Sequence, residues 1–276
     1  MLKQRIITAA VMTLVILPLL WFAYLPYLME SVMAVLVVVA TYELFHACIG
    51  KINSPASMAI FSVTALAAAL LQFLTLPHYA VFLGVFWVLA IGIFAYFMPR
   101  ISAFSISGYP QAILLSLVTA FFFKSVPALC HMEHGNWYIL LCLATSITTE
   151  MTGFFVGRAH GKHKLAPTLS PNKSIEGAVS ACILPPLFLS FVIFILQFTC
   201  LLTVRWGYLI LYLVLGTVVT QFGDLAFSLI KRATGIKDFG KILPGHGGIL
   251  DRFDAQCFLT PYTFLFITVA KAFIIW

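Results

Sequence analysis

The chain has 276 residues, of which 62% are hydrophobic and only 9% are charged, and its formal net charge is +7. Soluble domains are about 45–50% apolar and about 25% charged, so this composition excludes a soluble globular domain and indicates that lipid surrounds much of the protein. The positive charge does not indicate a nucleic-acid partner, because the basic residues gather in segments on one side of the predicted membrane spans.

Nine apolar stretches are long enough to cross a bilayer, which takes roughly 20 mostly apolar residues per helix. Backbone groups in lipid must be paired within the segment, so the sequence predicts an all-α, polytopic integral membrane protein with about nine transmembrane helices. The stretches are approximately 6–25, 31–49, 57–76, 79–98, 111–130, 136–157, 177–203, 207–230 and 256–276. No small-residue cleavage site follows the first stretch, so we expect it to be a span and not a signal peptide.

The distribution of basic residues predicts how the spans are oriented. With the N-terminus inside, thirteen of the sixteen basic residues fall in the cytoplasmic segments, which are 1–5, 50–56, 99–110, 158–176 and 231–255. This asymmetry agrees with the positive-inside rule. We therefore expect a multi-pass protein of the cell inner (plasma) membrane, with its N-terminus in the cytoplasm.

The two halves of the chain differ in character. Residues 1–130 consist of apolar spans with short loops and predict a scaffold of transmembrane helices. Within it, Glu43 and His46 could be functional, but a hydrogen-bonded pair near the membrane interface is the favoured interpretation. Polar residues concentrate in 131–276, which predicts a catalytic region with cytoplasmic loops 158–176 and 231–255. In the seventh span, Pro185 and Pro186 are expected to kink or break the helix.

The loop 158–176 and the spans that flank it bring basic and acidic groups together. Lys173 and Ser174 come just before the seventh span and Glu176 is in its first turn, a loose match to a capping box. Basic residues here are candidates for contacts with a polyphosphate. Glu150 is an acid within the sixth span, and we expect it to be a neighbour of Asp224.

Asp224 lies within the eighth span, seven residues before Lys231, which places it about 10 Å along the helix from the basic end. An ionisable group at this depth costs several kcal/mol unless it is partnered, and is by default a functional candidate. Ser228, Lys231 and Arg232 share its helical face. The alternative is that Asp224 forms a structural ion pair with Lys231 or Arg232.

Two further acids, Asp251 and Asp254, are placed at the start of the ninth span, after the glycine-rich segment 244–248. They could act only as helix caps, because carboxylates are favoured at helix N-termini. The preceding Pro-Gly-His-Gly-Gly favours a second interpretation, since consecutive free N–H groups before a helix make an anion cradle. His246 would add a donor, and Lys237 brings positive charge.

Carboxylates on two helices beside a glycine-rich, cationic loop are typical of phosphoryl chemistry. Carboxylate oxygens hold Mg²⁺, which bridges phosphate oxygens, while lysine, arginine and backbone N–H groups neutralise the remaining charge. Free carboxylates alone would repel a polyphosphate, so their presence implies a metal ion between them and the substrate. The candidate ligands are Asp224 and Asp251, with Asp254 and Glu150 as additional candidates.

At these residues the chain closely resembles the phosphatidate cytidylyltransferase (CDP-diglyceride synthase) family. The shared signature reads Ser-x-x-Lys-Arg, Lys-Asp-x-Gly, Pro-Gly-His-Gly-Gly and Asp-Arg-x-Asp between Ser228 and Asp254, and Gly223-Asp224 also matches. The resemblance extends over about 150–257. It implies a CTP-dependent nucleotidyltransferase of phospholipid biosynthesis, which converts CTP and phosphatidate to CDP-diacylglycerol and pyrophosphate at the cytoplasmic membrane face. It also implies Mg²⁺, a monovalent cation such as K⁺, and a homodimer, to which the N-terminal helices could contribute contacts.

The resemblance also assigns roles to individual residues. The metal-binding acids are Asp224 and Asp251. The catalytic residues are Asp224, Asp251, Lys231 and Arg232. The substrate-binding residues are Ser228, Lys237, His246, Gly247, Gly248, Arg252, Lys173 and Ser174. The chain departs from the family pattern in 150–154, where Glu150 replaces an aspartate and Phe154 a tyrosine, and at Asn172, where the family has a lysine.

Two other functions use similar residues. A CTP-dependent lipid kinase of the polyprenol or phytol type would need the same acids and cations. An anion transporter with a basic cytoplasmic mouth belongs to a different class, but it has no need of metal-binding acids. A homologue without activity is a third alternative, suggested by the departure at Glu150.

Overall fold

The computed structural model describes residues 14, 18–19, 21–22, 25, 27–75, 78–103, 108–199, 203–242, 247–270 and 274–275. Within these residues, eight helices are long and apolar enough to cross a membrane. They confirm the predicted all-α, multi-pass architecture. Most of the predicted span 6–25 lies outside the described residues, as do Pro244, Gly245 and His246.

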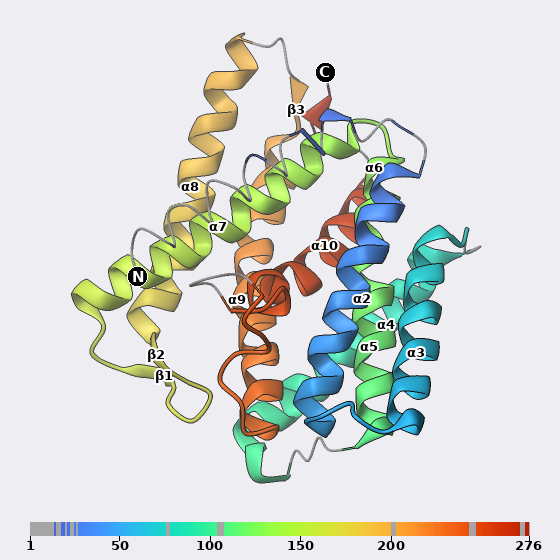
Figure 1. Ribbon diagram of the computed structural model, residues 1–276. Helices are drawn as coiled ribbons and strands as arrows, with labels where there is room; N and C mark the ends of the chain where they lie inside the picture. The colour runs from blue at the N-terminus through green and yellow to red at the C-terminus, as the bar shows by residue number, and fades with distance from the viewer. Residues whose placement is uncertain are drawn as a thin grey trace.

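The helices follow one another with short connections (Figure 1). In chain order the elements are α2 (Leu28–Ile49), α3 (Pro55–Phe73), α4 (Tyr79–Phe97), the 3₁₀ helix η1 (Met98–Ala103), α5 (Tyr109–Phe123), α6 (Ser125–Cys130), α7 (Gly135–His160), β1 (Lys164–Ala166), β2 (Ser170–Ser174), α8 (Ile175–Thr199), β3 (Thr203–Val204), α9 (Trp206–Ala233), α10 (Leu250–Ala270) and β4 (Ile274–Ile275).

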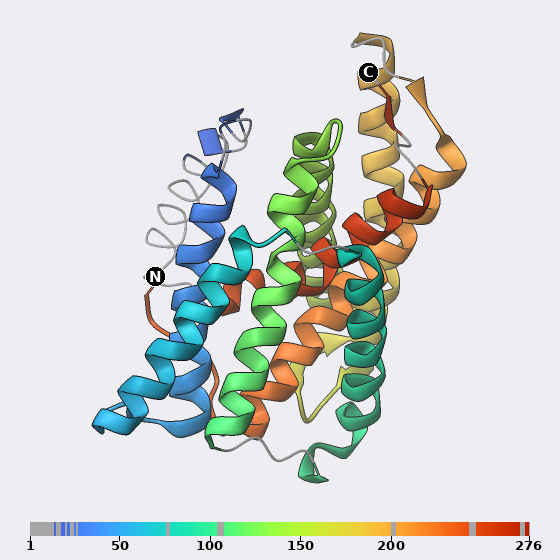
Figure 2. The same ribbon diagram turned by 90° about the vertical axis from the view of Figure 1, so that its right-hand side faces the viewer.

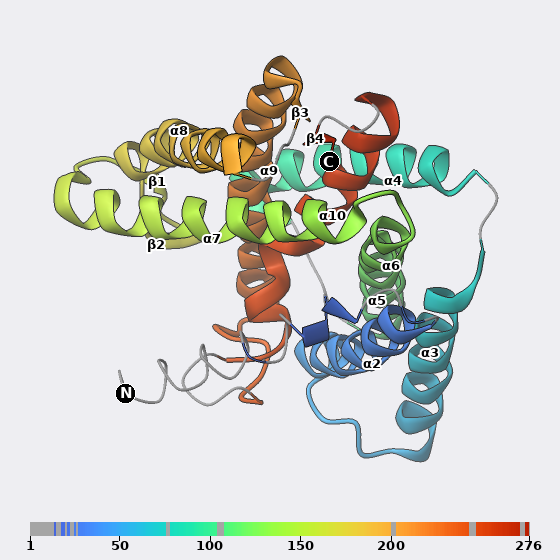
Figure 3. The same ribbon diagram turned by 90° about the horizontal axis from the view of Figure 1, so that it is seen from above.

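Alternating helix directions bring the C-terminal ends of α2, α7 and α9 and the N-terminal ends of α3, α5 and α8 to one end of the bundle. This end is the lower one in Figure 1 and also carries the β1–β2 hairpin, and Figure 2 shows the same arrangement from the side. These are the segments that the sequence predicts to be cytoplasmic. Seen from above, α10 lies between a group formed by α2, α3 and α5 and a group formed by α7, α8 and α9 (Figure 3). It is the most buried of the eight spans, at 67%.

Glycines allow α7 and α8 to pack unusually closely. A Cβ added at Gly177 of α8 would lie 2.6 Å from the carbonyl oxygen of Gly153 and 3.0 Å from the Cα of Gly157, both on α7. Small residues at such a crossing let helix backbones approach and gain packing contacts in lipid. This contact holds α7 and α8 together beside the hairpin that joins them.

Two local predictions differ from the structure. The helix α8 continues without interruption through Pro185 and Pro186, so the predicted break is wrong. Membrane helices tolerate proline because other groups satisfy the carbonyl oxygens that lose their N–H donors. The loop predicted at 158–176 contains a short antiparallel hairpin, in which Lys164 is paired with Ser174. The last helix begins at Leu250, before the apolar stretch 256–276, and Asp251 and Asp254 lie at its start as predicted.

Candidate active site

A cavity of about 240 Å³ opens between α7, α8, α9 and strand β2. Its lining is divided between polar and apolar side chains. The polar and charged residues of the lining include Glu150, Asn172, Lys173, Gln221 and Asp224, and the apolar ones include Phe154, Leu165, Ala178 and Ala181. The cavity thus offers two carboxylates and one ammonium group next to an apolar surface.

Asp224 is paired with Lys173 across the cavity. The Nζ of Lys173 lies 2.5 Å from Oδ2 of Asp224, and both side chains are about a quarter exposed, at 26% and 27%. The hydroxyl of Ser228 reaches Oδ1 of Asp224 only at 3.5 Å. Asp224 is therefore paired with a lysine of the hairpin, and not with Lys231 or Arg232 as the alternative interpretation of its helix predicted.

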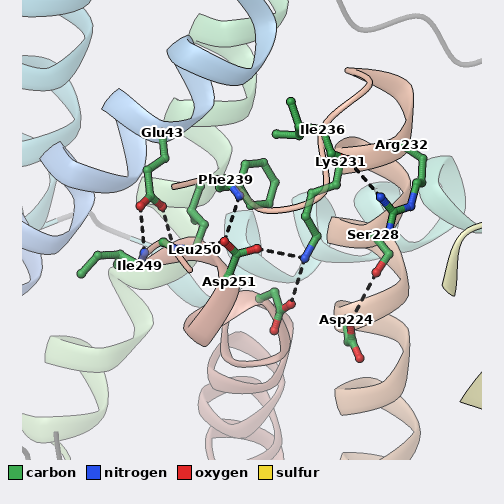
Figure 4. Close-up of polar contacts among 12 residues, drawn as sticks. Glu43, Asp224, Ser228, Lys231, Arg232, Ile236, Phe239, Ile249, Leu250 and Asp251 are labelled. Carbon is green, nitrogen blue, oxygen red and sulfur yellow. Dashed lines mark hydrogen bonds and ion pairs between the residues drawn. The ribbon is translucent and has the colours of Figure 1, made fainter. Parts of the chain in front are cut away.

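Lys231 of α9 lies beside Asp251 of α10 (Figure 4), and its ammonium group is also near Asp254 of the same helix. Its Nζ is 3.1 Å from Oδ1 of Asp251 and 3.9 Å from Oδ2 of Asp254. The second oxygen of Asp251 accepts hydrogen bonds from the backbone N–H groups of Phe239, at 2.8 Å, and Gly248, at 2.9 Å. Asp251 therefore ties α9, α10 and the segment that joins them into one unit.

The two groups of charges are connected through Asp254. This buried carboxylate is close enough to Asp224 and Glu150 to interact electrostatically with both, and its Oδ1 accepts the N–H of Ala255 at 2.7 Å. Glu150 faces the cavity and accepts a hydrogen bond of 3.2 Å from the hydroxyl of Ser146. The predicted proximity of Glu150 and Asp224 is seen here, because both line the same cavity.

The same acids are the candidate ligands for a metal ion. Among the residues that the structure describes, no three His, Cys, Asp or Glu side chains are grouped closely enough to form a metal site by themselves. Mg²⁺ is usually held by one or two carboxylates together with substrate phosphates and water. Glu150 of α7 and Asp224 of α9, which line the same cavity, fit that requirement. Asp251 lies beside the connecting segment, so its joint role with Asp224 stays a prediction.

Two predicted site residues, the catalytic candidate Arg232 and the substrate-binding candidate Ser174, have structural partners. The guanidinium of Arg232 donates from Nε to the carbonyl oxygen of Leu169, at 3.1 Å, and from Nη1 to that of Ile236, at 3.0 Å. It thereby ties the tip of the hairpin to the segment after α9. Ser174 is the N-terminal cap of α8, because its Oγ accepts the N–H of Gly177 at 3.1 Å; it also lines the cavity.

Other predicted substrate-binding residues lie around this end of the bundle. Lys237 and Arg252 are exposed, and Arg252 is within electrostatic range of Glu150. Gly247 has a φ of 87°, in the left-handed region where a glycine is favoured. A Cβ at this position would lie 2.8 Å from Oδ2 of Asp251. Gly247 and Gly248 therefore determine the backbone conformation directly beside Asp251.

Glu43 is a residue that the sequence did not assign to the site. Its carboxylate accepts the N–H groups of Ile249 and Leu250, each at 2.8 Å, at the start of α10 (Figure 4). The predicted pairing of Glu43 with His46 is wrong, because the carboxylate is turned toward a different helix. Only its charge on an apolar helix marked it as unusual.

Comparisons with known proteins agree with the motifs of the second half. A family model described as "Cytidylyltransferase family" matches residues 3–270. The chain is similar to proteins named phosphatidate cytidylyltransferase. That of Bacillus subtilis (strain 168) is 36% identical over 137 residues, which are 50% of this chain and 49% of the relative. That of Staphylococcus haemolyticus (strain JCSC1435) is 43% identical over 131 residues, 46% of this chain and 47% of the relative. That of Staphylococcus aureus (strain COL) is 43% identical over 133 residues, which are 47% of this chain and 48% of the relative. The chain thus spans about half the length of the curated relatives it matches.

Proposed function

Because the chain belongs to the cytidylyltransferase family, we propose that it transfers the cytidylyl group of CTP to phosphatidate, forming CDP-diacylglycerol and pyrophosphate. The observation that carries this proposal is the cavity in which Glu150, Lys173 and Asp224 lie together. The names of the similar proteins point to the same reaction. They give no support to a lipid kinase or an anion transporter.

The divided lining of the cavity suits the two ends of phosphatidate. Its phosphate would lie against Lys173, while its acyl chains would extend along the apolar wall that includes Phe154 and Ala181. Phe154 is 60% exposed on the outer surface of α7, so the cavity wall continues into the surface that lipid covers. A lipid substrate would then reach the site from within the membrane.

The proposed reaction forms one bond and breaks one. A phosphate oxygen of phosphatidate attacks the α-phosphorus of CTP, and the bond from this phosphorus to the oxygen bridging to the β-phosphorus breaks. Pyrophosphate leaves with that oxygen. The phosphate monoester is already anionic, so the step needs no strong base. Lys173 and Lys231 lie where ammonium groups would orient phosphates and neutralise the charge that develops on the leaving group.

We assign Mg²⁺ as the cofactor and Asp224 as its principal ligand, with Glu150 as a second ligand that lines the same cavity. When bound, Mg²⁺ would neutralise phosphate charge and polarise the α-phosphoryl group. Asp254 lies close to both acids, and Asp251 holds Lys231 beside them. A monovalent cation such as K⁺ and direct phosphate contacts from the segment 244–248 remain part of this proposal.

We further propose that the site faces the cytoplasm, at the inner membrane of the cell. The loops at the lower end of the bundle in Figure 1 carry the basic residues predicted to remain inside. Residues 1–130 would serve as the scaffold, with dimer contacts, and 131–276 as the catalytic region. Measuring the mass of the purified protein in detergent would test the homodimer.

A labelled-nucleotide assay tests the proposed reaction. Purified protein is incubated with phosphatidate, Mg²⁺ and CTP carrying label at either the α- or the γ-phosphate. We expect the α-label to enter the lipid fraction and the γ-label to appear in pyrophosphate. Entry of the γ-label into lipid would show a kinase instead, and no labelled lipid with either nucleotide would refute the proposal.

A further inference from the structure

The further inference concerns Glu43, which is on α2 in the predicted scaffold half of the chain. Its side chain is buried, with 1% of the residue exposed, and its two oxygens each accept one backbone N–H from the start of α10. Leu250 is the first residue of α10 and Ile249 precedes it. The first N–H groups of a helix have no partner within the helix, so Glu43 caps α10 from more than 200 residues away in the chain.

The Glu43 carboxylate also fixes the positions of Gly240 and Gly248. A Cβ added at either Gly240 or Gly248 would overlap the Glu43 carboxylate, and the one at Gly240 would also lie 3.2 Å from the Cα of Gly248. Both glycine backbones therefore lie directly against this side chain. Glu43 therefore holds residues 240 and 248 side by side, next to the start of α10.

Gly248 is connected directly to the proposed catalytic charges. The N–H of Gly248 donates to Oδ2 of Asp251, whose other oxygen is paired with Lys231. Figure 4 shows this sequence of contacts running from Glu43 through the start of α10 to Lys231. A change in the position of Gly248 would therefore move Asp251, and with it the ammonium group of Lys231.

The charge on Glu43 is stabilised by backbone groups. Within the described part of the chain, Glu43 forms no ion pair, and the nearby Asp251 has the same charge sign. Two N–H donors at a helix N-terminus, where the helix dipole is positive, stabilise a carboxylate. A neutral amide in its place keeps the shape but presents a donor to one of the two N–H groups.

We propose that Glu43 is a positioning residue for the nucleotide phosphates: it fastens Gly240, Gly248 and the start of α10, so that Asp251 holds the ammonium group of Lys231 toward the triphosphate of CTP. The inference rests on the proposed function and adds to it a residue from the first half of the chain. Glu43 does not touch the substrate; it acts through Gly248 and Asp251. Its loss should therefore affect the handling of CTP more than that of the lipid.

The test compares Glu43→Gln and Glu43→Asp with Glu30→Gln in the full-length protein. Glu30 is a matched control, because it is also a buried acid of α2, but it is bonded to His131 toward the other end of the helix. For Glu43→Gln we expect the KM for CTP to rise about tenfold, with the KM for phosphatidate unchanged. Glu43→Asp keeps the charge and should recover part of this loss, whereas Glu30→Gln should match the unchanged protein.

Hydrogen–deuterium exchange of the amides of 247–251 gives a readout that does not depend on turnover. Glu43→Gln should speed exchange at Ile249 and Leu250, and Glu30→Gln should not. The inference is refuted if Glu43→Gln leaves both the CTP KM and these exchange rates unchanged, or if it lowers kcat while both KM values stay constant, as a simple loss of folded protein would. If the unchanged protein transferred no cytidylyl group, the proposed function would fail. The exchange rates would still decide whether Glu43 fastens the segment.

Discussion

Replacing Lys231 with methionine should reveal how strongly the paired acids of α10 depend on its charge. Lys231 is buried beside two carboxylates, and the side chains of Asp251 and Asp254 are only 3% and 11% exposed. Removing the cation leaves buried negative charges without a counter-charge, which costs about 3–5 kcal/mol. At roughly 2 °C per kcal/mol for a chain of this size, Lys231→Met should lower Tm by at least about 6 °C. Catalysis should be lost as well.

The assay is thermal unfolding of the purified variants in the same detergent, followed by the labelled-CTP assay. Lys162→Met is the control, because Lys162 is exposed at the same end of the bundle and should change Tm by less than about 1 °C. The double variant with Lys231→Met and Asp251→Asn removes one of the uncompensated charges, so it should regain part of the lost Tm while staying inactive. A Tm for Lys231→Met equal to that of the control would refute the reasoning.

Three further outcomes follow from the site and the helix packing. Asp224→Asn should lower turnover by about 10³-fold or more, yet reduce stability by at most about 1 kcal/mol, because its pair with Lys173 is partly exposed; retained turnover would contradict its role as a ligand. Gly177→Ala should destabilise the protein by about 1–3 kcal/mol, because its Cβ would press on the Gly153 carbonyl, whereas Gly207→Ala has open space and should be neutral in the same thermal assay. Removing divalent ions with a chelator should abolish transfer and added Mg²⁺ should restore it; transfer that persists in chelator would argue against a metal cofactor.

The main features of the fold could be predicted from hydropathy alone. The apolar stretches from about 31 onward correspond to the eight helices, because each needs a minimum length to cross lipid and must satisfy its own backbone groups. The depth of Asp224 and its proximity to Glu150 could also be predicted, since both acids interrupt apolar helices. These inferences depend only on local sequence and on the thickness of the bilayer.

Most other long-range contacts could not be predicted in this way. The partners of Glu43 are backbone N–H groups, which every residue has, so no residue type at the start of α10 identifies them. The same reason hid the structural role of Arg232, whose guanidinium donates to two backbone carbonyl oxygens. The pairing of Lys173 with Asp224 depended on the hairpin, and its Gly, Pro and Ser content predicted only a loop.

The surroundings of the membrane-embedded acids indicate where a cation would bind. Glu43 accepts two backbone N–H groups, and Asp251 accepts two N–H groups and an ammonium group, so the oxygens of both are already engaged with residues around the start of α10. Glu150 accepts one hydrogen bond of 3.2 Å, and Asp224 is a quarter exposed beside a lysine, while Asp254 adds a third negative charge close to both. Mutual repulsion among these three acids costs free energy that a divalent ion would relieve. This difference supports the proposal that Glu150 and Asp224, which line the cavity, are the metal ligands, whereas Glu43 and Asp251 position the start of α10.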